Sequence, residues 1–396
     1  MRITAPPAAA WSSALIAALV GFGGTVALVV QAMRTLGADI DQTGSAVTAL
    51  CLAIGFTGFV LSLRLRVPVV LAWSTPGAAL LAAATPGLTW PIAIGVFLAA
   101  AVMMIVIGLV PLFGRLAERI PAAVASAMLA GVLLPFCLGL FRLGAIDPLL
   151  VALLVGVFLA ARQRVPLYAL LLVLAAGVIL TLIRGDVAAL PDGPIFGAFA
   201  PTLPVFDPAA IVGLALPLFL VTLVSQNLPG LVVLRSAGYQ PDPRPLLTGT
   251  GFASLVAAPF GAHAVNLAAI TAAIVTSDEA HPDRSKRWVV GAIYAGFYLV
   301  LALFSPALVR FFLALPGEIV AALTGIALIP ALTGALENSL AQKADRDPAI
   351  VTFLATASGL TLLGIGSAFW GLVAGFSALA ARAALASRPK STGSGA

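Results

Sequence analysis

The sequence predicts an all-α membrane protein with fourteen transmembrane segments, arranged as a 7+7 inverted repeat with half-crossings in segments 3 and 10. Three observations lead to this prediction. The 396 residues are 61% hydrophobic and 9% charged, whereas a soluble domain has about 25% charged residues. Basic residues gather on alternate connections between apolar runs. Four pairs of residues recur at nearly one offset, close to half the chain length.

The apolar runs set the number of segments, because about 20 helical residues cross a bilayer. The first run, Trp11 to Met33, is too long for the apolar part of a signal peptide. The segments are predicted at 12–33, 43–63, 68–84, 91–112, 121–141, 148–161, 166–183, 208–233, 246–259, 261–276, 288–309, 317–335, 349–365 and 368–386. The longest connection, 184–207, is rich in Pro and Gly, and the polar tail 387–396 is expected to be disordered.

The positive-inside rule tests this count. With the N-terminus inside, seventeen of the 21 Lys and Arg residues lie on the cytoplasmic side and four lie outside. If segments 3 and 10 did not cross, the division would worsen to thirteen against eight. Fourteen crossings with both termini cytoplasmic fit the charges best. The net charge of +6 is therefore explained by orientation in a lipid bilayer, and we expect no binding of nucleic acid.

The two halves of the chain match each other. The matching pairs are Pro121 and Pro316, Pro135 and Pro330, and Gln31 and Gln226, each 195 residues apart, and Pro68 and Pro259, 191 apart. An offset near 195 contains seven crossings. Because seven is odd, the second half enters the membrane from the opposite side, which is the arrangement that places a substrate site between the halves. The repeats are predicted to be 1–195 and 196–386.

Segment 3 contains LAWSTPGAALLAAA (Leu71 to Ala84), which interrupts an apolar run with polar and helix-breaking residues. Residues 67–73 have an extended character, and Ser74 or Thr75 followed by Pro76 predicts the start of a short helix. Irregular backbone at membrane depth is tolerated only where it is buried in protein or lines a cavity. Segment 3 is therefore predicted to be a half-crossing.

Segment 10 is predicted to repeat this design, with 260–265 extended, Asn266 as a helix cap and 267–274 helical. Two half-helix N-termini that meet at one point offer unpaired N–H groups and positive dipole ends. Such a point attracts an anion. His263 is the ionisable group that we place well inside a half-crossing, so we expect it to carry a proton or to contact a ligand carboxylate. The alternative is a neutral histidine bonded to backbone.

Three further groups of side chains are expected to bind a substrate at this point. The hydroxyl and amide donors beside the half-helices are Ser74, Thr75 and Asn266. The midspan amides are Gln31, Gln226 and Asn227. The aromatic rings that can stack on a ligand are Trp73, Phe22 and Phe260. Each group has a structural alternative, namely helix capping, hydrogen bonding between helices and core packing.

Other motifs are assigned structural roles. The glycines at 21, 23 and 24 do not complete a nucleotide-binding loop, since G-x-G-x-x-G fails at Val26, and indicate close helix packing. His281 is expected to be solvated, and Cys51 and Cys137 to be buried. We find no H-E-x-x-H, G-x-S-x-G, acidic pair or Cys/His cluster, so an enzyme, a cofactor and a metal site are not expected.

Several motifs resemble the benzoate/proton symporter family, BenE. They are VGFGGTVALVVQA (20–32), LAWSTPGAALLAA (71–83), LPLFLVTLVSQNLPGLVVLRSAGY (216–239), PFGAHAVNLAAITAAI (259–274) and EAHPD (279–283). The family is similar in architecture to nucleobase and sulphate-type anion transporters. The resemblance implies a core domain from 12–112 and 208–309 and a gate domain from 121–183 and 317–386. Nucleobase relatives bind substrate with a Glu in span 8, whereas this chain has Gln226 and Asn227 there.

The resemblance implies import of benzoate with a proton across a bacterial inner membrane by secondary active transport, with His263 as the expected proton carrier. It also implies a homodimer, since relatives of this fold are often dimers. Two alternatives stay open. One is a transporter of another small anion or a nucleobase on the same fold, and the other is a passive anion channel.

Overall fold

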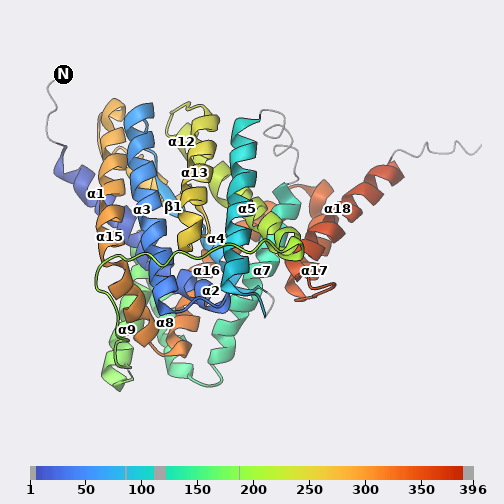
Figure 1. The fold of residues 1–396 in the computed structure, drawn as a ribbon, viewed down its shortest axis with the longest axis horizontal. Helices are drawn as coiled ribbons and strands as arrows, with labels where there is room; N and C mark the ends of the chain where they lie inside the picture. The colour runs from blue at the N-terminus through green and yellow to red at the C-terminus, as the bar shows by residue number, and fades with distance from the viewer. Residues whose placement is uncertain (1–5, 85–86, 111–121, 187, 387–396) are drawn as a thin grey trace, which may run out of the picture.

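The computed structural model describes residues 6–84, 87–110, 122–186 and 188–386 (Figure 1). Within these residues, nine helices are long and apolar enough to cross a membrane, and they coincide with nine of the fourteen predicted segments. The remaining five predicted segments, at 68–84, 148–161, 246–259, 261–276 and 349–365, form shorter elements. The tail 387–396 and the start of segment 5 at 121 lie outside the described residues.

The first half of the chain contains one strand and a series of helices. They are α1 (Ala8–Gly23), α2 (Val26–Thr35), α3 (Ile40–Leu65), β1 (Leu71–Trp73), α4 (Thr75–Ala82), α5 (Trp90–Leu109), α7 (Ala122–Leu143), α8 (Pro148–Arg164), η1 (Pro166–Tyr168) and α9 (Ala169–Arg184). Segment 1 is not continuous, because the helix breaks at Gly24 and Thr25. This break places the hydroxyl of Thr25 within hydrogen-bond distance of the indole of Trp73.

The second half begins with a helical rod that contains two π-helical turns. The rod consists of α10 (Pro208–Ala210), η2 (Ile211–Ala215), α11 (Leu216–Thr222), η3 (Leu223–Asn227) and α12 (Leu228–Ser236). The later elements are α13 (Pro243–Ala257), η4 (Ala258–Phe260), β2 (Val265–Leu267), α14 (Ile270–Val275), η5 (Arg284–Lys286), α15 (Trp288–Ala314), α16 (Gly317–Leu340), η6 (Lys343–Asp345), α17 (Arg346–Ala357) and α18 (Ser367–Ala386). Such π-helical turns are frequent at functional sites.

The two strands pair with each other although they come from opposite halves of the chain. They form an antiparallel ladder in which Leu71 faces Leu267, Ala72 faces Asn266 and Trp73 faces Val265. A serine from the preceding helix holds the start of each extended segment. Ser62 Oγ accepts from Val69 N at 3.1 Å, and Ser254 Oγ accepts from Val265 N at 2.8 Å. The same contact therefore recurs in the two halves.

The long helices pair across the two halves. α3 packs along α15, α5 packs along α13, and α7 packs along α16. Figure 1 shows α3 and α15 side by side. Three of the largest fully buried side chains are Trp73 of β1 and Tyr294 and Tyr298 of α15.

The connection 188–207, here called the strap, is extended and crosses α15, α3 and α5 (Figure 1). Backbone hydrogen bonds attach it along its length. Gly197 N donates to Leu303 O at 2.8 Å, Thr202 N to Pro259 O at 2.8 Å and Val205 N to Pro91 O at 2.9 Å. Its Pro- and Gly-rich sequence suits this course, because proline cannot continue a helix and favours extended backbone.

Two predicted helices have different bounds in the structure. The helix of segment 13 ends at Ala357 instead of reaching 365, because Gly359 and Leu363 adopt left-handed backbone with φ of 69° and 54°. The prediction that Asn266 caps a helix is wrong. The strand β2 continues through Leu267, so α14 begins only at Ile270, and its N-cap Ala269 makes no side-chain cap bond. The backbone pairing of the ladder takes precedence over the local capping preference.

Candidate functional site

The start of α4 carries the first group of candidate residues. Ser74, one of the two predicted cap residues, is the N-cap, and its Oγ accepts from Gly77 N at 2.9 Å. The carbonyl oxygen of Ser74 lies 3.1 Å from His263 Nε2. Because a carbonyl oxygen can only accept, Nε2 must donate, and the neutral ring then has its lone pair on Nδ1. His263 is 1% exposed, and this Nδ1 has no hydrogen-bond partner among the described residues.

The register of the ladder places the two short helices at its opposite ends. Ser74 lies beside His263, just before β2 begins, and Ala268 N donates to Val70 O at 2.9 Å, just before β1 begins. The sequence led us to expect that the two helix starts meet at one point. The ladder separates them, because antiparallel strands lead the chain away in opposite directions.

Asn227 joins the ladder to the helical rod of the second half. Its Oδ1 accepts from Leu267 N at 3.0 Å, and its Nδ2 donates to Asn266 Oδ1 at 3.0 Å. Both asparagines are almost fully buried. Asn266 Nδ2 makes no hydrogen bond within the part of the chain that the structure describes. The ladder therefore presents a buried N–H donor as well as the imidazole lone pair of His263, and these two atoms can bind an anion and a proton.

Trp73 lies against the break in segment 1. Its Nε1 donates to Thr25 Oγ1 at 2.8 Å, and its ring lies 5.3 Å from the ring of Phe22. Trp73 and Phe22, both predicted to stack on a ligand, are therefore in contact with each other in this structure. Thr25 was not among the predicted site residues. The signal for it was present, since Gly23-Gly24-Thr25 in an apolar helix permits a break.

A group of hydroxyls lies behind Trp73, and sequence reasoning did not find it. Tyr294 Oη donates to Leu71 O at 2.8 Å. Tyr298 Oη and Thr271 Oγ1 are buried, and neither has a hydrogen-bond partner in the described part of the protein. A Cβ on Gly21 would lie 2.9 Å from Tyr298 Oη, which confirms that this glycine allows close helix packing.

The remaining predicted residues lie elsewhere. Phe260 is half-buried and its ring packs 4.7 Å from that of Phe199 in the strap, away from the Trp73 and Phe22 pair. Gln31 Oε1 accepts from Thr324 Oγ1 of α16 at 3.3 Å, so it joins α2 to the helix that follows α15. Thr75 and Gln226 are half-buried, and among the described residues no side-chain hydrogen bond joins either to the ladder.

The described acidic residues all lie in connections or in the end turns of helices, so no carboxylate reaches the ladder. Within the same residues, no three His, Cys, Asp or Glu side chains gather as a metal site. The polar groups at the ladder are instead uncharged hydrogen-bond donors and one imidazole. A buried carboxylate would repel an anion, so this composition suits a negatively charged ligand.

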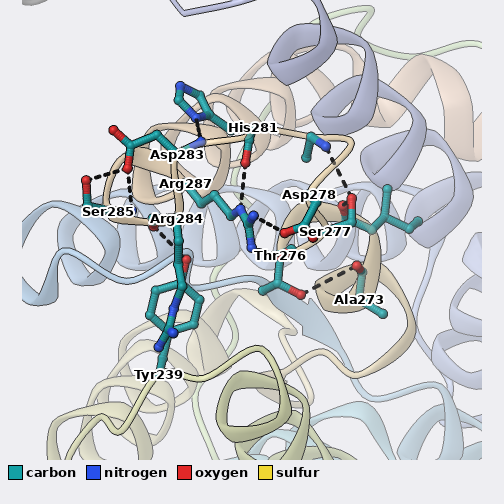
Figure 2. Close-up of polar contacts among 12 residues, drawn as sticks. Tyr239, Ala273, Thr276, Ser277, Asp278, His281, Asp283, Arg284, Ser285 and Arg287 are labelled. Atoms are coloured by element: carbon teal, nitrogen blue, oxygen red, sulfur yellow. Dashed lines mark hydrogen bonds and ion pairs between the residues drawn. The ribbon is translucent and has the colours of Figure 1, made fainter.

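Arg287 holds the far end of α14. Its guanidinium is 5% exposed. Figure 2 shows that Nε donates to His281 O at 2.7 Å and Nη1 to Thr276 O at 2.9 Å, while Nη2 pairs with Asp278. His281 is itself only 9% exposed, so the prediction that it is simply solvated is wrong. Thr276 is the C-cap of α14. The last carbonyls of a helix have no partner within the helix. Arg287 thus supplies a hydrogen-bond donor to the Thr276 carbonyl at the end of the six-residue helix α14.

Replacing Arg287 with alanine is expected to lower the stability of the protein by about 2–4 kcal/mol, because two buried carbonyls lose a charged donor. Thermal unfolding in detergent measures the effect, and Arg287→Lys should recover part of it. Lys286→Ala is the matched control, since Lys286 is exposed and pairs with Asp283 at 3.6 Å. Equal midpoints for Arg287→Ala and Lys286→Ala would contradict this role.

Solved structures share this fold. The transmembrane domain of a cyanobacterium bicarbonate transporter, BicA, matches with a TM-score of 0.59 and 16% identity, over 92% of this chain and 97% of that one. The overall structure of SLC26A9 matches with a TM-score of 0.66 and 16% identity, over 96% of this chain and 66% of that one. At this level of identity the likeness concerns the fold. Together with the apolar helices, it defines the class of the protein, a multi-pass membrane protein with the fold of these structures.

The chain belongs to the benzoate membrane transport protein family, BenE, whose family model matches residues 4–381. Inner membrane protein YdcO of Escherichia coli (strain K12) is 42% identical over 379 residues, which are 95% of this chain and 96% of that protein. The benzoate membrane transport protein of Acinetobacter baylyi is 34% identical over 360 residues, 91% of each chain. The protein is therefore a membrane transporter of small anions.

Proposed function

We propose that the protein imports benzoate or a similar aromatic carboxylate together with a proton, by alternating access across a bacterial inner membrane. The observation that carries the proposal is the unpaired Nδ1 of His263, buried beside the start of α4. A buried lone pair with no partner is a place where a proton can bind. Trp73 and Phe22 supply apolar surface for an aromatic ring nearby.

The charges make proton coupling reasonable. A proton on Nδ1 turns His263 into a buried cation, and no carboxylate of the described protein is near enough to balance it. The carboxylate of the substrate can balance that charge, so each ligand favours the binding of the other. Moving an anion inward against a negative interior costs about 2.3 kcal/mol per 100 mV, and the proton cancels this cost.

The same proposal includes the topology. We assign fourteen crossings as a 7+7 inverted repeat, with β1–α4 and β2–α14 as half-crossings and both termini cytoplasmic. The pairing of α3 with α15 and of α5 with α13 supports it, as does the serine contact that recurs in the two halves.

The proposal also divides the chain into two domains. Residues 12–112 and 208–309 form the core domain, and 121–183 and 317–386 form the gate domain. The Gln31 to Thr324 bond then joins core to gate, and two chains assemble as a homodimer.

Uptake of radiolabelled benzoate into proteoliposomes tests the function. We expect accumulation when the external pH is lower than the internal pH, and its loss when a protonophore collapses the gradient. Unlabelled bicarbonate and nucleobases should compete poorly, whereas substituted benzoates should compete well. Uptake that does not depend on the pH gradient would contradict proton coupling. Flux without counterflow exchange would indicate a channel.

A further inference from the structure

A cavity that shares no lining residue with the ladder lies between the strap and the ends of α3 and α15 that face the proposed extracellular side. Its volume is about 310 Å³, which is at the lower end of the roughly 300–1,000 Å³ range of small-molecule sites. Ile40, Phe199 and Pro306 provide apolar walls. Backbone contacts fix the strap above it, since Ala200 N donates to Ser45 Oγ at 2.9 Å. The cavity is therefore bounded by attached backbone.

Arg310 supplies a positive charge to this cavity. Its Nη1 donates to Pro191 O at 3.1 Å and its Nη2 to Pro194 O at 2.8 Å. The Nε–H is buried and has no hydrogen-bond partner in the described ranges of the chain. Among the described residues no carboxylate forms an ion pair with Arg310. Carbonyl groups thus orient the guanidinium without neutralising it, and a buried unpaired donor of this kind is costly unless a ligand completes it.

Asp41 is the other charged residue of the cavity. It is exposed to solvent, where its charge is screened more strongly than a buried charge. The cavity thus combines an oriented, partly buried cation with an aromatic ring and two aliphatic walls. This combination matches an aromatic carboxylate, whose charge would meet Arg310 and whose ring would meet Phe199. A phosphate or a sugar would leave these apolar walls unused.

We infer that this cavity is an outer binding site that captures an aromatic carboxylate before transport, with Arg310 as its anion-binding residue. The inference rests on the proposed function, because it assumes that such an anion is the substrate. The lining of this cavity includes no residue of the ladder, so each chain binds two such anions. Because the cavity lies on the outer side, the positive charge of Arg310 raises the local concentration of the anionic substrate there.

The test uses 4-fluorobenzoate and the full chain in lipid nanodiscs, with fluorine NMR to count and titrate bound ligand. We expect two bound populations in the unmodified protein. Arg310→Gln should weaken one of them at least roughly tenfold, as expected for loss of a charged hydrogen bond. Ala198→Trp should remove the same population by filling the cavity, since Ala198 lines it. Asp41→Asn should strengthen it.

Two controls keep the result unambiguous. Arg142→Gln removes an exposed arginine that does not line the cavity, and should change neither population. Binding at the ladder serves as the folding control in every variant. A single population that is unaffected by Arg310→Gln and Ala198→Trp would overturn the outer site and leave the proposed function intact. Absence of any 4-fluorobenzoate binding would overturn both.

Discussion

Replacing His263 with glutamine is expected to abolish accumulation of benzoate driven by a pH gradient, while exchange of internal for external benzoate continues at a rate reduced less than about tenfold. Glutamine can still donate to Ser74 O, so the bond seen at 3.1 Å has a substitute. It cannot take up the proton that we assign to the unpaired Nδ1. Coupling should therefore fail while the site itself persists. Paired accumulation and counterflow assays in proteoliposomes measure the two activities.

The pH dependence of exchange gives a second readout of His263. If proton and anion favour each other, benzoate binds more tightly as the pH falls, and the reciprocal linkage is about tenfold per pH unit while the proton carrier is mostly unprotonated. The KM for exchange should therefore rise with pH in the unmodified protein and stay flat in His263→Gln. His281→Gln is the matched control, because the chain has two histidines. Equal loss of accumulation and exchange in His263→Gln would show a binding or structural role instead.

Replacing Asn227 with alanine is expected to reduce both accumulation and exchange by about 10- to 100-fold. The substitution leaves the Leu267 N–H and Asn266 Oδ1 without the partners recorded at 3.0 Å. A buried group that loses its partner costs about 1–3 kcal/mol, and both groups belong to strand β2. The ladder should shift away from the helical rod, so the site should lose its geometry in every mode of transport.

Gln226→Ala is the control for Asn227, since it removes an amide of similar size from the neighbouring position. Gln226 is half-buried, whereas Asn227 is fully buried. We expect Gln226→Ala to retain most uptake. Transport assays and thermal unfolding should be measured together for both variants. If Asn227→Ala were as active as Gln226→Ala, the ladder would not depend on this side chain.

The contrast between Gln226 and Asn227 shows what sequence reasoning can and cannot predict. Both residues were predicted to lie at midspan, and both were assigned the same two alternatives. The structure separates them because the π-helical turn η3 (Leu223–Asn227) rotates the rod and directs Asn227 at β2. Such a turn depends on partners elsewhere in the fold. In the same way, Phe260 has the aromatic ring expected of a ligand contact, but in the structure this ring packs on Phe199.

The sequence by itself determined the membrane class, the positions of most helices, the cap at Ser74 and the motifs of the transporter family. These features follow from rules that act over a few neighbouring residues, namely apolar length, charge placement and capping. Only the tertiary structure decided which buried polar atoms lack a partner, His263 Nδ1 and Asn266 Nδ2 among them, and where Arg310 lies. A buried donor or acceptor is satisfied by whichever group packing brings to it, and in this protein that group often comes from the other half of the chain.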